Sequence, residues 1–149
     1  MRVLSIDPGT RNLGWCLWDG TVIDFGVIDL QEVCKGTDYP KKIWALKQTG
    51  FFDNADVILV ERQMQSRMKM LACAIRCFYY DRTKMIAPQS VRRHFKTIMK
   101  SHAKNKKAHI HYVQDYLKGP LLRKFKLHKK KDDISDTIMQ LLYWLSSEA

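Results

Sequence analysis

Residues 3–20 read VLSIDPGTRNLGWCLWDG, and this stretch decides the architecture of the N-terminal part of the chain. Residues 3–6 are an apolar run that ends at Asp7, where a Pro-Gly pair stops a strand. A second apolar run, residues 13–18, ends at Asp19-Gly20, a dipeptide typical of a two-residue hairpin turn. Strand-forming sequence resumes over residues 21–30. The stretch therefore predicts three antiparallel strands joined as a meander.

The rest of the chain alternates strand and helix patterns. Residues 56–60, DVILV, form a buried-strand pattern that ends at Glu61, as the first strand ends at Asp7. We predict a further strand over residues 84–87 and helices over residues 41–51, 64–80, 89–99, 104–117 and 133–147. This order predicts an α/β fold with a mixed five-stranded sheet, the meander plus two parallel strands, flanked by helices. At 149 residues, we expect one domain spanning 1–149.

The composition is that of a globular protein, with 46% hydrophobic and 28% charged residues. No apolar run approaches the roughly 20 residues of a membrane-spanning helix, which excludes a helical membrane protein. The N-terminus has the features neither of a secretory signal nor of an Arg-rich transit peptide. We therefore expect an intracellular protein with no membrane partner.

The net charge of +11 is concentrated in one part of the chain. Residues 92–131 hold fourteen Lys or Arg and a single acid, Asp115. A basic block of this kind favours a polyanion partner, because each neutralised phosphate releases condensed counterions. Nucleic acid is the first candidate, and a solvated lysine-rich surface is the alternative.

Four acids stand at the ends of predicted elements. Asp7 and Glu61 end two strands, while Asp133 and Asp136 lie three residues apart in the first turn of the last helix. Each one alone has an ordinary explanation as a turn former, a surface charge or a helix N-terminal charge. Together they would repel one another unless a multivalent cation neutralised them. Oxygen ligands favour Mg²⁺ or Mn²⁺, and two such ions would support phosphodiester hydrolysis.

Three segments that carry these acids resemble the acidic motifs of RuvC-like Holliday junction resolvases. They are LSIDPGTRNLGW (residues 4–15), ILVERQ (residues 58–63) and KKDDISDT (residues 130–137), and their order and spacing agree over nearly the whole chain. The second motif is closer to the poxvirus-type and fungal mitochondrial branches than to the bacterial form. The resemblance implies an RNase H-like fold, Mg²⁺ dependence with Mn²⁺ as a substitute, and a homodimer that nicks opposed strands of a four-way DNA junction during recombination or replication. The lack of transit-peptide features disfavours mitochondrial import, so we expect a viral or bacterial-type enzyme in the cytoplasm or at a site of DNA replication.

The resemblance also assigns roles to residues. It implies that Asp7, Glu61, Asp133 and Asp136 bind the metal and catalyse, with Asp132 left as an alternative to Asp133. The match through NKKAHIHYV (residues 105–113) points to a catalytic Lys107, with Lys106 as the less favoured choice. The remaining basic residues expected to contact DNA are Arg92, Arg93, Lys106, Lys129 and Lys130.

Two other functions share these residues. An RNase H-like nuclease that cuts RNA/DNA hybrids, or a nuclease for other branched DNA, would use the same carboxylates. A catalytically silent junction-binding protein would keep the fold, but it would be expected to lack one of the acids. The helix over residues 64–80 is expected to pack in the core, and the resemblance implies that it also forms the subunit contact.

Several side chains outside these motifs also carry expectations. Cys73 and Cys77 stand one helical turn apart and are expected to be buried thiols rather than metal ligands. His109 is expected to contact phosphate weakly or to lie on the solvated surface. Trp44 and Trp144 are expected in the core.

Overall fold

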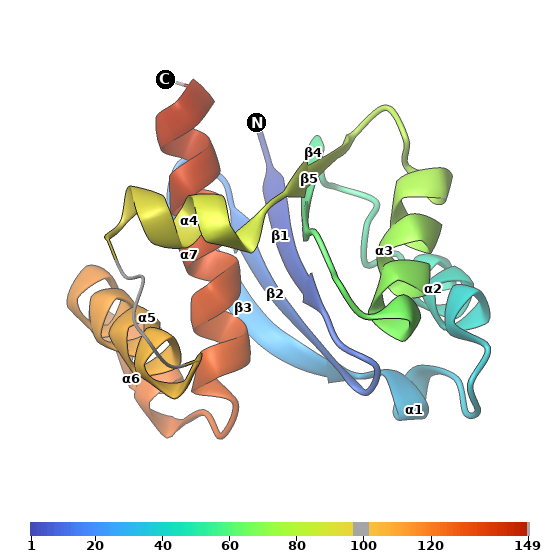
Figure 1. Ribbon diagram of the computed structural model, residues 1–149, viewed down its shortest axis with the longest axis horizontal. Coiled ribbons are helices and arrows are strands. Elements are labelled where there is room, and N and C mark those ends of the chain that lie inside the picture. Colours follow the sequence, from blue (N-terminus) through green and yellow to red (C-terminus); the bar gives the residue numbers. More distant parts are fainter. Residues whose placement is uncertain (97–101, 149) are drawn as a thin grey trace.

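The computed structural model describes residues 1–96 and 102–148, which build one mixed sheet with helices on both faces (Figure 1). The strands are β1 (Val3–Pro8), β2 (Asn12–Trp18), β3 (Val22–Asp29), β4 (Val57–Glu61) and β5 (Thr83–Ile86). The helices are α1 (Leu30–Val33), α2 (Tyr39–Gln48), α3 (Ser66–Phe78), α4 (Pro88–His94), α5 (His102–Tyr116), α6 (Gly119–Leu127) and α7 (Lys131–Glu148).

The order of the strands in the sheet is β3-β2-β1-β4-β5. β1 and β3 pair with β2 in antiparallel fashion, and the Asp19-Gly20 turn joins β2 to β3, with Gly20 at a φ of 79°. β4 pairs in parallel with both β1 and β5. The predicted mixed five-stranded sheet, a meander extended by two parallel strands, is therefore confirmed.

Side-chain alternation along β1 divides the core between the two faces of the sheet. Leu4 and Ile6 pack with α2 and α3, which lie to the right of the sheet in Figure 1. Val3 packs on the other face with Ile134 and Ile138 of α7. Because the alternation has a period of two, Ser5 and Asp7 share the α7 face with Val3. That alternation decides which layer of helices meets the first acidic motif.

Two helices of the structure are absent from the sequence prediction. α1 occupies the end of a segment that we predicted as continuous strand to residue 30, and Asp29 caps it by accepting a hydrogen bond from the Gln31 backbone N–H. α6 begins at Gly119, where we expected only the end of the preceding helix. The reason is that Pro120 stands in the first turn of α6, a position at which proline starts a helix as readily as it stops one.

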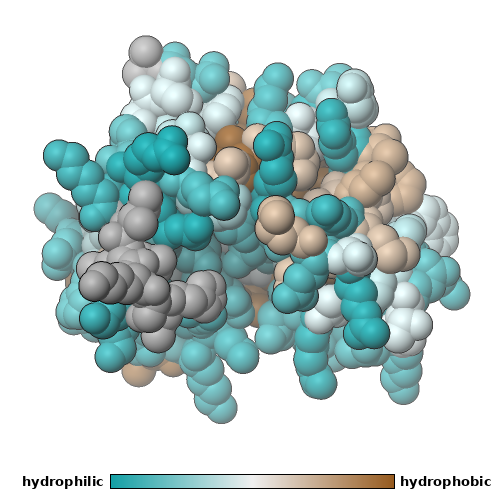
Figure 2. Space-filling model, viewed as in Figure 1, coloured by the Kyte–Doolittle hydropathy of each residue, from teal (hydrophilic) through white to brown (hydrophobic). Residues whose placement is uncertain are grey.

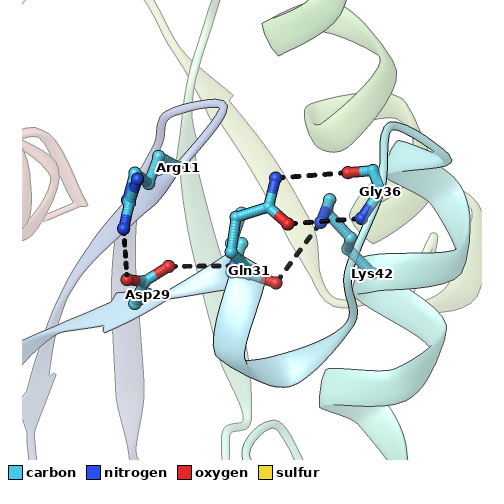
Figure 3. A network of polar contacts seen from close by, with 6 residues as sticks. Arg11, Asp29, Gln31, Gly36 and Lys42 are labelled. Atoms are coloured by element: carbon cyan, nitrogen blue, oxygen red, sulfur yellow. Dashed lines mark hydrogen bonds and ion pairs between the residues drawn. The ribbon is translucent and has the colours of Figure 1, made fainter.

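Polar contacts fix α1 to the loop that follows β1 (Figure 3). The Asp29 carboxylate accepts a hydrogen bond from Arg11 Nη2 at 3.4 Å, and the Leu30 backbone N–H donates to the Arg11 carbonyl at 2.7 Å. The buried Lys42 ammonium donates to the carbonyls of Leu30 and Cys34, on the other side of α1. The contacts with Asp29 and Leu30 anchor Arg11 of this loop beside the end of β3.

Some expectations about individual side chains and boundaries are wrong. Trp144 is buried as expected, whereas half of the Trp44 surface is exposed on α2. Cys73 and Cys77 are exposed thiols on α3, not buried ones. The helix predicted over residues 89–99 corresponds to α4, which ends at His94, and positions 97–99 of that prediction lie outside the described residues.

Across residues 1–96 and 102–148, none of the helices has both the length and the apolar character required to span a bilayer.

Candidate active site

Strand pairing brings the first two predicted acids together. β1 and β4 run in parallel with Ile6 opposite Val60, so Asp7 and Glu61 follow side by side at the carboxyl ends of the two central strands. This edge of a parallel pair is the usual place for ligands in α/β sheets. Gln63 stabilises the second acid, because its amide Nε2 donates to Glu61 Oε2 at 3.0 Å.

The last helix delivers the other two acids to the same place. α7 crosses β1 and β2, and it approaches β2 closely at Gly14, the partner of Asp7 in the sheet register. A Cβ atom on Gly14 would lie 2.7 Å from the carbonyl oxygen of Asp133. The absence of a side chain at this position therefore lets the first turn of α7 settle onto the sheet beside Asp7.

A cavity of about 240 Å³ opens where these elements meet. All four predicted acids line it, together with residues from the loop after β1, from α4 and from α5. Its lining comprises Asp7, Pro8, Gly9, Asn12, Glu61, Gln63, Met68, Pro88, Val91, Arg92, Lys106, His109, Asp133, Asp136 and Gln140. The structure thus brings together four acids from β1, β4 and α7 that are more than 120 residues apart at the extremes.

Burial and neighbouring negative charges disfavour the ionised forms of Asp7 and Asp133. Burial raises the pKa of Asp7 well above its ordinary value, and the negative charge of Glu61 and a hydrogen bond shared with it raise the pKa further. Burial, followed by the charge of Asp132, raises the pKa of Asp133 to about 6. A bound cation would therefore stabilise the ionised cluster.

Asp132 differs from Asp133 in its surroundings. The Asp132 carboxylate forms an ion pair with Lys106 Nζ at 2.9 Å, and it is not among the cavity-lining residues. Although burial raises the pKa of Asp132, the hydrogen bond and charge of Lys106 outweigh this and leave the pKa below its ordinary value. Of the two alternatives, the structure places Asp133 in the cavity.

The basic residues predicted at the site divide into two groups. Lys106 and Arg92 line the cavity, from α5 and α4 respectively. Lys107, which the sequence favoured over Lys106, is exposed and is not among the cavity-lining residues, and its catalytic role stays a prediction. The other predicted DNA contacts, Arg93, Lys129 and Lys130, are exposed outside the cavity.

His109 is a site residue that sequence reasoning missed. Its Nδ1 lies 2.8 Å from Asp136 Oδ1, and only 7% of its side chain is exposed, so the expectation of a solvated histidine is wrong. The helical spacing could have predicted its burial, because His109 lies one turn before the buried Val113 on the same face of α5. In metal sites, a hydrogen bond from a neighbouring residue that does not itself bind the metal commonly orients a carboxylate ligand.

The arrangement can attract a hard cation, although the carboxylates do not converge on a single metal position. Within residues 1–96 and 102–148, no group of three or more His, Cys, Asp or Glu side chains has the geometry of a finished metal site. The donors that line the cavity are nonetheless carboxylate oxygens, which prefer Mg²⁺ or Mn²⁺.

Comparisons with known proteins identify a matching family and similar solved structures. The model of the family described as "Poxvirus A22 protein" matches residues 1–147, whereas a comparison with the curated proteins finds no match. Fowlpox virus resolvase, solved with its substrate Holliday junction DNA, is 20% identical with a TM-score of 0.74, and the match covers 99% of each chain.

Two further solved structures are similar. The yeast mitochondrial Holliday junction resolvase Ydc2 is 20% identical with a TM-score of 0.72, and the match covers 96% of this chain and 78% of that one. Thermus thermophilus RuvC is 12% identical with a TM-score of 0.57, and the match covers 99% and 97% of the two chains. These likenesses confirm the predicted RNase H-like fold.

Proposed function

Because the chain belongs to the poxvirus A22 protein family, we propose that it is a metal-dependent, structure-specific endonuclease that resolves four-way DNA junctions by paired nicking. The family match bears out the resemblance to poxvirus-type resolvases drawn from the sequence. The observation that carries the proposal is the meeting of Asp7, Glu61, Asp133 and Asp136 in one cavity. All four acids are present, which disfavours a catalytically silent junction-binding protein.

The donor set fits divalent cations, Mg²⁺ in the first place with Mn²⁺ as a substitute. Asp7, Glu61, Asp133 and Asp136 would hold them, and the raised pKa values of Asp7 and Asp133 support this assignment, because a bound cation would stabilise their ionised forms. When bound, two such ions activate a water and stabilise the leaving oxygen of a phosphodiester. The chain's own carboxylates must be ionised to bind them, so proton release accompanies metal binding.

The basic residues around the cavity account for the binding of the DNA backbone. An ion pair with Asp132 holds Lys106 at the cavity, and Arg92 lines the cavity from α4. We propose that both contact phosphates next to the scissile one, while the exposed Arg93, Lys129 and Lys130 contact phosphates farther along. Figure 2 shows hydrophilic side chains gathered on the side of the molecule occupied by α4–α6. These contacts position the backbone and do not read its sequence.

We further propose that residues 1–149 act as one domain and that two copies associate through α3. The site itself needs β1 and α7, from the two ends of the chain. The outer side of α3 carries an apolar hollow of about 470 Å³. It is lined by Pro40, Lys69, Met70, Cys73, Ala74, Cys77 and Phe78. Exposed apolar patches of this kind mark interfaces, and a two-fold dimer would present two active sites to two opposed strands.

The test is cleavage of a synthetic four-way junction with Mg²⁺, using wild type, Asp7→Asn and Glu61→Gln. We expect wild type to make paired nicks across the branch point. Both variants should lose cleavage by more than the 10–100-fold that loss of an outer contact causes, while still binding junctions without Mg²⁺. Asp81→Asn removes an exposed acid outside the cavity and serves as the matched control.

Two results would contradict the proposal. If the Asp7 and Glu61 variants cleave as fast as wild type, the carboxylates are not catalytic; if they lose folding and junction binding together with cleavage, the carboxylates are structural. If wild type cuts an RNA/DNA hybrid duplex faster than the junction, the RNase H-like alternative is correct.

A further inference from the structure

A buried polar network joins β1 to α7 directly behind the acidic cavity. Ser5 is completely buried and Gln140 is 3% exposed. A buried amide or hydroxyl destabilises a protein unless its hydrogen bonds are replaced. Both side chains meet this condition through each other and through backbone carbonyls on the two elements.

The network uses its donors across the interface between strand and helix. Gln140 Nε2 donates to Ser5 Oγ at 3.0 Å and to the Ile6 carbonyl at 3.2 Å, which accounts for both amide hydrogens. The Ser5 hydroxyl in turn donates to the carbonyl of Thr137 at 2.7 Å. The hydrogen bonds therefore run from the Gln140 side chain on α7 to the Ser5 side chain on β1 and back to the backbone of α7 at Thr137.

Both ends of this link lie beside proposed metal ligands. Ile6 directly precedes Asp7, and Thr137 directly follows Asp136. Gln140 stands one helical turn beyond Asp136 and lines the cavity itself. Apolar packing between a helix and a sheet resists separation but is compatible with small sliding movements, whereas hydrogen bonds are directional. The three bonds therefore fix where the first turn of α7 stands along β1.

We propose that Ser5 and Gln140 are positioning residues that set the spacing between Asp7 on β1 and the Asp133–Asp136 pair on α7, and so set the affinity for the divalent cation. This inference rests on the proposed metal-binding function of the site. Metal sites need their ligands within about 0.5 Å of the productive geometry, so a modest slip of α7 weakens binding without unfolding the chain.

Neighbouring hydroxyls on α7 offer the comparison that isolates this role. Ser135 is completely buried, as Ser5 is, but its hydroxyl donates to the Asp132 carbonyl of its own helix at 3.0 Å. Removing it takes away a buried hydroxyl without removing a bond from helix to strand. Ser135→Ala is therefore the matched control for loss of the link.

The experiment measures Mn²⁺ binding without DNA, with free Mn²⁺ followed by electron paramagnetic resonance. Ser5→Thr and Ser5→Val both add a methyl-sized group in the same buried place, and they differ only in whether a hydroxyl remains. Gln140→Met keeps the length of the side chain and removes the amide. We expect Ser5→Val and Gln140→Met to raise the Kd for Mn²⁺ about tenfold, the lower end of the effect of losing an outer-shell contact. Ser5→Val should bind about tenfold more weakly than Ser5→Thr, and Ser135→Ala should bind like wild type.

The outcomes are separable because each variant is also checked for folding by its thermal unfolding midpoint. Folded Gln140→Met and Ser5→Val chains that bind Mn²⁺ like wild type would overturn the inference, as would equal weakening by Ser5→Thr and Ser5→Val. Wild type that binds Mn²⁺ but leaves four-way junctions uncut would contradict the proposed function and leave this inference standing.

Discussion

Asp133 gives the site a pH dependence that can be measured without DNA. Its pKa is raised to about 6 by burial and by the charge of Asp132, against an ordinary value of 3.8. An acid whose pKa is higher in the folded state favours folding while it is protonated. Its contribution is therefore complete below about pH 4 and is lost as the pH rises towards 6. Above that pH, the metal-free protein carries the charge of a partly buried carboxylate that Lys130 and Lys106 only partly offset.

We expect the free energy of unfolding of the chelator-treated protein to fall between about pH 4 and pH 6, and Asp133→Asn to reduce this fall. Added Mg²⁺ should restore stability at pH 7 in wild type more than in the variant. Urea unfolding across this pH range measures both effects. If Asp133→Asn shows the same pH slope as wild type, the carboxylate does not occupy the environment described.

The side chains of the site were predictable to different degrees. Four acids at the ends of elements could be assigned from the sequence, because strand ends and helix starts are readable from hydrophobic runs and breakers. Lys106 and Lys107 could not be ranked in the same way. Adjacent residues on a helix differ by about 100° in direction, so their order depends on the rotation of α5 against its neighbours. His109 was missed because its partner, Asp136, lies 27 residues away on another helix.

At the scale of elements, the contact between β2 and α7 at Gly14 decides where the last two acids stand. A Cβ on Gly14 would come within 2.7 Å of the Asp133 carbonyl oxygen, and backbone atoms cannot turn aside as a side chain can. Gly14→Ala should therefore displace the first turn of α7. Misplacement by about 1 Å can cost a hundredfold in rate, so we expect a tenfold to hundredfold slower cleavage under single-turnover conditions.

Gly26→Ala provides the control for this prediction. A Cβ on Gly26 would lie 3.0 Å from Trp15 Nε1, which belongs to a side chain that can adjust. We expect a modest loss of stability and an unchanged rate. Equal cleavage by Gly14→Ala and wild type, or an equal loss in both variants, would contradict the role given to this contact.

The elements that the sequence predicted well are those whose pattern is local. The hairpin turn after β2, the run of β4 and the apolar stripe of α7 each lie within one segment, and each was found near its true position. α1 and α6 were missed for a different reason. α1 has only four residues, held by a cap and by distant partners such as Arg11 and Lys42, and α6 begins with residues that also end helices.

For the whole molecule, the prediction concerns the outer side of α3. Met70 is 45% exposed and Phe78 is 40% exposed there, on either side of the two exposed cysteines. If two copies associate through this surface, a carboxylate placed in it must be desolvated on association. We expect Met70→Glu to shift the protein from dimer to monomer in sedimentation equilibrium. Leu127→Glu, at an 85% exposed position on α6, should leave the dimer intact.

The dimer prediction has its own contradicting result. A wild-type chain that sediments as a monomer at all concentrations would remove the proposed association. A Met70→Glu variant that remains dimeric would place the interface elsewhere on the surface.

Anomalous diffraction from crystals soaked in Mn²⁺ tests most directly whether the cavity gathers cations. We expect anomalous density among the carboxylates of Asp7, Glu61, Asp133 and Asp136, and its loss in crystals of Asp7→Asn. Crystals of the folded wild-type protein that show no density there at saturating Mn²⁺, or density only at other acids, would contradict the account.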